Sequence, residues 1–212
     1  TKDMFLDENG DVIQNKSRYS SWASGVPGTV DGLGYAHDKY GSMPWDLLLY
    51  PAINLAKYGF NLDYHNILLF NSDRYKYLLS NDTESKKIFI KSHNYNIDEV
   101  FVQNDLANTL LRIAKYGYRE FYEGITADHI IACMIRTNGL ISYNDLRNYK
   151  SIEREAISFN YKGYRVHSMP PPSSGGITLA NILNQFEHVN IEKVDPKDSK
   201  FIHLLVEIEK RA

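Results

Sequence analysis

Apolar residues recur at helical spacing over much of the chain, and a glycine follows most of these stretches. Side chains that return every three or four residues form one continuous face, which a helix buries against its neighbours. A glycine directly after such a stretch is usual at a helix end, because it readily adopts the backbone conformation that caps the helix. The pattern predicts helices at 30–40, 45–58, 106–116 and 125–136, and shorter ones at 177–183 and 201–208.

Three local signals add detail to this pattern. Ser42 is placed to cap the second predicted helix. Ser142 and Asp145 have the spacing of a capping box, in which each side chain bonds the backbone of the other residue. The polar stretch 80–87 predicts a loop that leads into a short strand at 88–90.

Late in the chain the hydrophobic period changes from that of a helix to that of a strand. At 156–159 and 164–167 apolar and polar side chains alternate, and Lys162-Gly163 between them is a turn signal. We predict an antiparallel hairpin over 152–166 that feeds a central sheet. Near the start, Asn9-Gly10 predicts another hairpin, in which both residues take the positive φ angles of a type I′ turn.

The composition is that of an ordinary folded protein. Hydrophobic residues make up 43% and charged residues 24% of the chain, which rules out disorder as its general state. The formal net charge of −2 gives nucleic acid no electrostatic attraction, and no apolar run approaches the ~20 residues that span a bilayer. The single cysteine, Cys133, excludes an internal disulfide and a cysteine-built zinc site.

Two patterns suggest metal binding, and both have simpler explanations. Asp7, Asn9 and Asp11 alternate as in a calcium loop, but the glycine stands at the fourth loop position and no glutamate closes the loop. We therefore interpret this segment as a turn. The histidines never adopt a ligand spacing such as H-E-x-x-H, so only a site assembled from distant segments stays open. They stand at positions 37, 65, 93, 129, 167, 188 and 203.

Three further patterns are more typical of a structural role, or of chance, than of a binding or catalytic site. The four glycines between Gly25 and Gly34 fit neither the dinucleotide nor the P-loop fingerprint, so we interpret them as points of close backbone packing. Cys133 lies in an apolar helical stretch and is predicted to be a buried, inert thiol. Asn15 and Asn81 begin glycosylation sequons, a pattern short enough to recur by chance.

Ser173 and Ser174 are the best local candidates for acyl-transfer chemistry. They precede Gly175-Gly176 at a predicted helix start, where backbone amides are able to form an oxyanion hole, and His167 is close in sequence. However, the G-x-S-x-G motif is absent, and a serine before a helix is most often a cap. We predict that both serines are structural.

Several segments together resemble the large subunit of the gamma-glutamyltranspeptidases. One reads A-S-G-V-P-G-T-V at 23–30 and continues as H-D-K-Y-G-S-M-P at 37–44. The next reads Q-N-D-L-A at 103–107 and is followed by F-Y-E-G, and the most specific reads S-M-P-P-P-S-S-G-G-I at 168–177. Order and spacing match over essentially the whole chain, and Ala156 departs from the family pattern, which has proline there.

The resemblance implies an α+β chain, predominantly helical with a β-hairpin in its C-terminal half. It would form part of a four-layer αββα N-terminal-nucleophile hydrolase fold, with 1–212 as a single incomplete domain. Family members are made as one precursor that cuts itself. The new N-terminal threonine of the small subunit attacks the gamma-glutamyl amide of glutathione or a related compound, and water, an amino acid or a dipeptide takes the glutamyl group. This covalent catalysis requires no metal or organic cofactor.

Carrying the family's site over residue by residue places none of the catalytic residues in this chain. The resemblance puts the threonine, the oxyanion-hole glycines and most substrate contacts beyond Ala212, and a carboxylate-binding arginine just before Thr1. We therefore expect an interior segment of the large subunit, whose partners are the rest of that subunit and the small catalytic subunit. The sixteen tyrosines fit a chain that packs against another. The last helical stretch has no cap signal, which fits a chain that continues.

Two other functions stay open. One is a non-catalytic helical binding module that keeps the family scaffold without its chemistry. The other is a poly-gamma-glutamate depolymerase of the same superfamily, although the doubled serines and glycines after Pro172 are more similar to the transpeptidases. The resemblance also suggests a periplasmic, secreted or extracellular-facing location.

Overall fold

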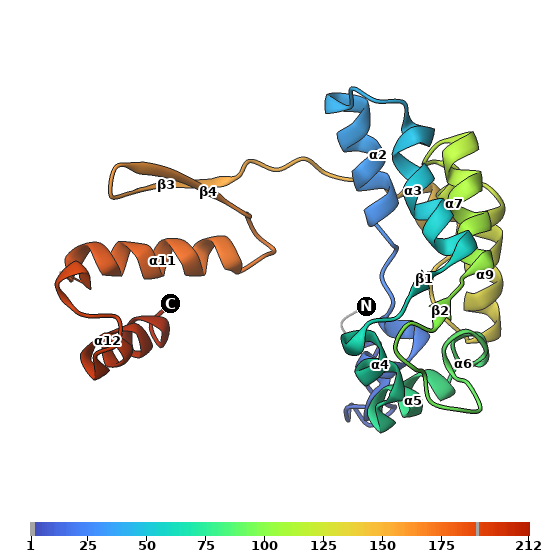
Figure 1. Cartoon of the computed structure of the whole chain (residues 1–212), viewed down its shortest axis with the longest axis horizontal. Helices are drawn as coiled ribbons and strands as arrows, with labels where there is room; N and C mark the ends of the chain where they lie inside the picture. Colours follow the sequence, from blue (N-terminus) through green and yellow to red (C-terminus); the bar gives the residue numbers. More distant parts are fainter. Residues whose placement is uncertain (1–2, 190) are drawn as a thin grey trace. The chain divides into compact units, whose positions relative to one another are not determined.

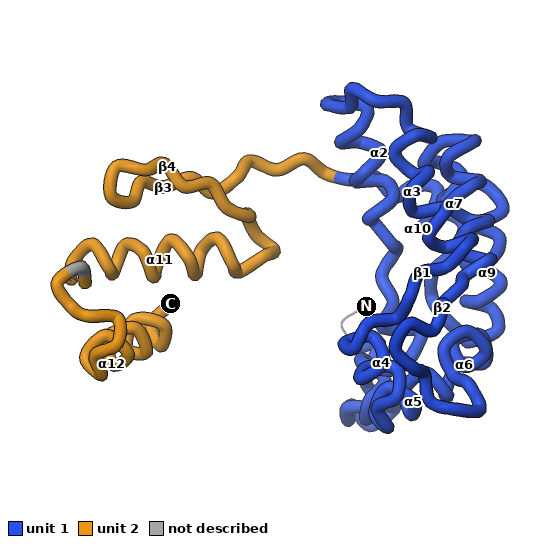
Figure 2. Tube along the Cα trace, in the orientation of Figure 1, with its two compact units in different colours: residues 1–151 blue, residues 152–212 orange. Residues whose placement is uncertain are grey.

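The computed structural model describes residues 3–189 and 191–212, and most of them lie in helices (Figure 1). The chain divides into two compact units, Thr1–Ser151 and Ile152–Ala212 (Figure 2). Each unit is described by itself below. None of the described helices is long and apolar enough to cross a membrane.

Unit 1 is a set of helices joined by one short sheet. Its two short strands pair antiparallel, with Phe60 opposite Phe101. In chain order the elements are α1 (Lys16–Tyr19), η1 (Ser21–Ala23), α2 (Thr29–Tyr40), α3 (Trp45–Tyr58), β1 (Phe60–Asn61), α4 (Tyr64–Asn71), α5 (Asp73–Ser80), α6 (Thr83–Phe89), β2 (Val100–Phe101), α7 (Asn104–Tyr116), α8 (Glu120–Glu123), α9 (Ile125–Arg136) and α10 (Tyr143–Asn148).

Two clusters of buried side chains form the core of unit 1. One surrounds Tyr122 and Leu146 and joins α8, α9 and α10. The other surrounds Leu62, Phe70 and Phe101, where aromatic rings of α4 and β2 meet with centroids 5.4 Å apart. Both clusters contain buried aromatic rings, so some of the chain's many tyrosines and phenylalanines lie in the core.

Unit 2 is a hairpin followed by two helices. It contains β3 (Ile157–Tyr161), β4 (Tyr164–Ser168), α11 (Gly175–His188), η2 (Ile191–Lys193) and α12 (Ser199–Glu209). The hairpin prediction is confirmed from residue 157 on and is wrong for 152–156, which do not form a strand. The strands β3 and β4 pair antiparallel about Lys162 and Gly163, whose φ angles of 47° and 82° match the twist of the strands. The hairpin is two-stranded within the described residues, so its place in a larger sheet stays a prediction.

The four long predicted helices are confirmed as α2, α3, α7 and α9. Gly59 ends α3 and Gly117 ends α7, both with φ of 83°, a conformation that other residues adopt at a cost. Pro51 lies inside α3 without ending it. The predicted cap at Ser42 is wrong, because the residue before the first turn of α3 is Pro44.

Side chains that cap a helix start explain the structure of two further segments. The capping box of Ser142 and Asp145 is confirmed at the start of α10. The predicted loop at 80–87 and strand at 88–90 are wrong, because 83–89 form the helix α6. The side chain of Asp82 accepts a hydrogen bond of 2.7 Å from the backbone amide of Ser85, which starts a helix in a polar stretch.

The turn at Asn9-Gly10 forms, but it is not of type I′. Gly10 has a φ of 85°, whereas Asn9 does not have a positive φ. The carboxylate of Asp7 instead accepts backbone hydrogen bonds of 2.9 Å from both Asn9 and Asp11. This Asx-type turn brings Leu6 and Val12 into an isolated β-bridge.

Candidate functional site

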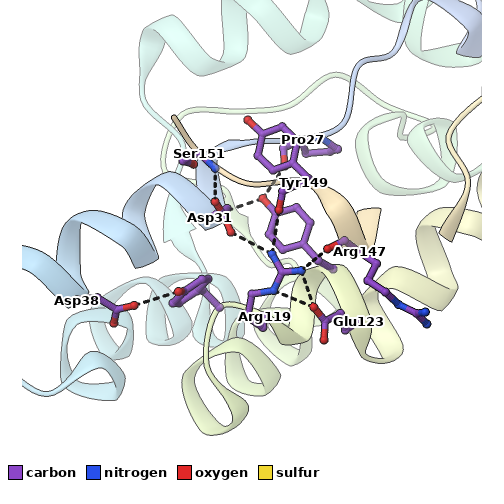
Figure 3. Close-up of polar contacts among 10 residues, drawn as sticks. Pro27, Asp31, Asp38, Arg119, Glu123, Arg147, Tyr149 and Ser151 are labelled. Carbon is purple, nitrogen blue, oxygen red and sulfur yellow. Dashed lines mark hydrogen bonds and ion pairs between the residues drawn. The ribbon is translucent and has the colours of Figure 1, made fainter. Parts of the chain in front are cut away.

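Arg119 is the centre of the densest polar network in the described part of the chain (Figure 3). It stands just before α8, and its guanidinium donates to four other residues. Nη1 lies 3.1 Å from the carboxylate of Asp31 and 3.1 Å from the carbonyl oxygen of Tyr149, and Nη2 lies 2.9 Å from the carbonyl oxygen of Arg147. Nε donates to Glu123 at 3.0 Å. One side chain thereby joins α8 to α2 and to the segment that follows α10.

Asp31 completes the network from the first turn of α2. It is 5% exposed, and its second carboxylate oxygen accepts a hydrogen bond of 2.6 Å from the backbone amide of Ser151. The phenol of Tyr122 accepts from the backbone amide of Asp31 at 3.1 Å and donates to the carbonyl oxygen of Pro27 at 2.6 Å. A buried charge is tolerated when it is paired and hydrogen-bonded in this way. The network therefore fixes the start of α2 and the last residues of unit 1.

The pKa values of three groups at or beside this network, Arg119, Tyr122 and Tyr118, are raised above their ordinary values. Burial alone would lower the pKa of Arg119, but the hydrogen bonds and charges of Glu123 and Asp31 raise it. Burial raises the pKa of Tyr122, and the hydrogen bond to Asp38 raises that of Tyr118. A general acid or base works best with a pKa near the operating pH. These shifts move ionisation away from neutral pH and indicate a structural network.

The network lines a polar pocket of about 800 Å³. Three cationic side chains and two carboxylates contribute to its wall. Asp31 and Arg119 face each other and are already bonded, whereas the side chain of Arg147 points away from the network (Figure 3). The lining residues are Asp31, Tyr35, Tyr118, Arg119, Glu123, Arg147, Asn148, Lys150 and Ser151.

A second ion pair with a buried carboxylate lies beside the first. Glu120, 8% exposed, accepts from Nε of Arg112 at 3.1 Å and from the backbone amide and hydroxyl of Thr126 at 3.1 and 2.7 Å. These contacts fix α7, α8 and the start of α9 together. The sequence analysis predicted neither ion pair. Asp31 and Arg119 are separated by 88 residues, and no local spacing marks partners that far apart.

The structure does not join Ser173 or Ser174 to His167 by a hydrogen bond. The imidazole Nδ1 of His167 lies 2.8 Å from the hydroxyl of Ser158, its partner across the hairpin. Ser173 accepts a hydrogen bond of 3.3 Å from the backbone amide of Gly175, and Ser174 is the residue that precedes α11. That the serines are structural stays a prediction, and the Ser173 contact fits it.

Close packing at the glycines of 25–34 is confirmed at two positions. A Cβ on Gly34 would lie 2.2 Å from the ring of Tyr118, and one on Gly28 would lie 2.1 Å from the phenol oxygen of Tyr149. Nothing lies within 4 Å of a Cβ placed on Gly25, so the prediction of close packing is wrong at that residue. These approaches let α2 pack directly on the segments that carry the Arg119 network.

The prediction that Cys133 is buried is wrong. The thiol is half-buried and lies 3.6 Å from the guanidinium of Arg136, because its side of α9 faces a pocket of about 590 Å³. Within residues 3–189 and 191–212, no three histidine, cysteine or acidic side chains converge as metal ligands would. At the calcium-like turn, the carboxylate of Asp7 is used by backbone amides.

Comparison with known proteins identifies the family. The family model "Gamma-glutamyltranspeptidase" matches residues 1–212. The chain belongs to this family. It is 41% identical to the glutathione hydrolase proenzyme of Escherichia coli K12, over 100% of this chain and 37% of that protein. It therefore spans little more than a third of the length of that relative.

Solved structures confirm the fold class. The chain superimposes on the gamma-glutamyltranspeptidase of Helicobacter pylori with a TM-score of 0.93 and 36% identity, covering 99% of this chain and 60% of that one. With the enzyme of Pseudomonas nitroreducens in complex with L-DON, the TM-score is 0.89 and the identity 39%, over 100% of this chain and 62% of that one. This family member is thus an α+β, mostly helical part of an N-terminal-nucleophile hydrolase fold.

Proposed function

We propose that this chain is the interior of the large subunit of a gamma-glutamyltransferase or glutathione hydrolase. The observation that carries the proposal is the likeness to the Helicobacter pylori enzyme, which covers 99% of this chain but only 60% of that one. The partners of the segment are then the rest of the large subunit and the small catalytic subunit. The substrates are glutathione or other gamma-glutamyl compounds.

The proposed reaction is acyl transfer through a threonine outside this chain. Its hydroxyl oxygen attacks the gamma-glutamyl carbonyl carbon, its own α-amine takes the hydroxyl proton, and the leaving amine departs with a proton. Water or the amine of an amino acid or dipeptide then attacks the acyl-enzyme and releases the threonine. No metal or organic cofactor enters either step.

The role of the described residues is to hold the scaffold. The buried carboxylates of Asp31 and Glu120 are paired with the half-buried guanidinium groups of Arg119 and Arg112, so these contacts are suited to holding helices together.

The test is to produce the complete open reading frame and follow its self-cleavage by intact mass. The cleaved protein should release the chromophore from a gamma-glutamyl anilide, and a dipeptide acceptor should accelerate that release. Replacement of the new N-terminal threonine by alanine is the control and should abolish both cleavage and release. An uncleaved precursor with no activity would favour the binding module, and activity on poly-gamma-glutamate alone would favour the depolymerase.

A further inference from the structure

Two asparagines of the chain, Asn9 and Asn138, are followed directly by glycine. Asparagine is a chemically labile residue, and this dipeptide is its most labile context, because glycine has no side chain to hinder attack by its backbone nitrogen. That nitrogen bonds to the side-chain carbonyl carbon of the asparagine and closes a succinimide ring, and the side-chain nitrogen leaves as ammonia with the proton of the glycine amide. Water then opens the ring and leaves aspartate or isoaspartate.

The two sites differ in backbone restraint and not in solvent access, since both asparagines are exposed. Ring closure requires the peptide between asparagine and glycine to rotate until its nitrogen faces the side-chain carbonyl carbon. Hydrogen bonds to either polar group of that peptide therefore oppose the reaction, because they break before the rotation occurs.

The peptide between Asn138 and Gly139 is bonded at both of its polar groups. The amide of Gly139 donates to the carbonyl oxygen of Met134 at 2.7 Å, and the indole of Trp22 donates to the carbonyl oxygen of Asn138 at 2.7 Å. The amide of Asn138 also donates to the carbonyl oxygen of Ile135 at 3.4 Å, which completes a Schellman motif at the end of α9. Its φ of 53° is the left-handed conformation that this motif requires.

Side-chain packing holds the same turn in place. A Cβ added to Gly139 would lie 2.4 Å from the sulfur of Met134 and 3.2 Å from the Cβ of Ser21. The hydroxyl of Ser21 donates to the carbonyl oxygen of Thr137 at 2.7 Å. The end of α9 is thus fastened to η1, and the peptide rotates only when these contacts open together.

The peptide between Asn9 and Gly10 has one weaker restraint. The amide of Gly10 donates to the carbonyl oxygen of Asp7 at 3.1 Å, and no described residue donates to the carbonyl oxygen of Asn9. Nothing lies within 4 Å of a Cβ added to Gly10. The bond from the Asn9 amide to the Asp7 carboxylate belongs to the preceding peptide, so it does not hold the one that rotates.

We propose that Asn9 is a site of spontaneous deamidation in the folded protein, and that Asn138 is protected although it stands in the same dipeptide. The product places a further carboxylate beside Asp7, Glu8 and Asp11. Isoaspartate also adds a methylene group to the backbone of the turn. Like charges repel, and a longer backbone no longer matches the opposite arm, so the β-bridge across this turn weakens.

The experiment is peptide mapping of the complete protein after incubation at neutral and at mildly alkaline pH. Mass spectrometry records conversion at Asn9 and at Asn138, and a sample kept unfolded in urea gives the rate of each dipeptide without tertiary structure. In the folded protein Asn9 should convert at least about tenfold faster than Asn138, because only the second site must open first. In urea the two rates should be similar.

Trp22→Phe is the matched variant, because it removes the donor to the carbonyl oxygen of Asn138 and keeps an aromatic ring. It should accelerate conversion at Asn138 and leave the rate at Asn9 unchanged. Where this variant fails to fold, the folded and urea-treated samples of the natural chain decide the question by themselves. Equal rates at the two sites in the folded protein, faster conversion at Asn138, or an Asn9 that converts only in urea would each overturn the proposal. None of these measurements depends on the proposed enzymatic activity.

Discussion

The guanidinium of Arg119 lies 3.1 Å from the carboxylate of Asp31, although 88 residues separate them in the chain. The pair joins the turn before α8 to the first turn of α2. Because Asp31 also accepts from the backbone amide of Ser151, the contact fixes the point at which the chain leaves unit 1.

Replacing Arg119 by lysine should lower the free energy of unfolding by about 2 kcal/mol. An ammonium group cannot reproduce the planar fork that serves four acceptors, and it leaves the buried Asp31 carboxylate poorly paired. The matched control is Arg147→Lys, since that side chain points away from the network (Figure 3). Urea denaturation should show a change within about 0.5 kcal/mol for the control. Equal effects of the two substitutions would contradict the role of Arg119.

Replacing Gly34 by alanine should destabilise unit 1 by about 1–3 kcal/mol, despite the better helix propensity of alanine. The new methyl group would lie 2.2 Å from the ring of Tyr118, which is itself held by a hydrogen bond of 2.9 Å to Asp38. Gly25→Ala is the control, because nothing lies within 4 Å of its added Cβ. Thermal unfolding should separate the two variants, and a stable Gly34→Ala chain would show that α2 moves away from Tyr118 at little cost.

Replacing Tyr122 by phenylalanine should cost about 1–2 kcal/mol at pH 7, because the bond to Pro27 and the acceptor for the amide of Asp31 are lost. Burial raises the pKa of Tyr122 above its ordinary value of 10.0, so the unfolded chain releases the phenolic proton first. The stability of the natural chain should then fall as pH rises from about 10 towards the folded pKa.

The phenylalanine variant should show a flatter fall over the same alkaline range. Tyr164→Phe, at a position 76% exposed in the hairpin, should follow the natural chain. Denaturation midpoints collected between pH 7 and 11 test this, and parallel curves for Tyr122→Phe and the natural chain would refute it.

Neither Ser173 nor Ser174 should react with a gamma-glutamyl electrophile in the complete enzyme. Ser173 accepts a hydrogen bond from the amide of Gly175, and His167 is bonded to Ser158 instead of either serine. Peptide mass spectrometry after labelling should find the adduct on the N-terminal threonine of the small subunit. An adduct on either serine would show that a nucleophile lies inside these residues.

Residues 1–212 alone should release chromophore from a gamma-glutamyl anilide no faster than the uncatalysed reaction. The proposed nucleophile and base are one threonine outside the chain, and removal of a catalytic nucleophile costs factors of roughly a million in the serine-protease case. Activity that survives repurification and scales with protein concentration would contradict the prediction.

The sequence alone determined the elements whose signals are local. The helices α2, α3 and α7 end where a glycine follows an apolar face, and the hairpin of β3 and β4 turns at Lys162-Gly163. In these cases the backbone preference of a few neighbouring residues agrees with the hydrophobic period. Even the error at α6 is local, because the capping side chain of Asp82 outweighed a polar composition that is typical of a loop.

Only the tertiary structure decided which distant residues meet. No spacing could pair Asp31 with Arg119, which lie 88 residues apart, and the pair of Arg112 with Glu120 forms only where the chain turns from α7 into α8. The same packing leaves the thiol of Cys133 only half-buried, beside a pocket. A hydrophobic face predicts that a helix will be buried, but the shape and charge of its neighbours determine what covers it.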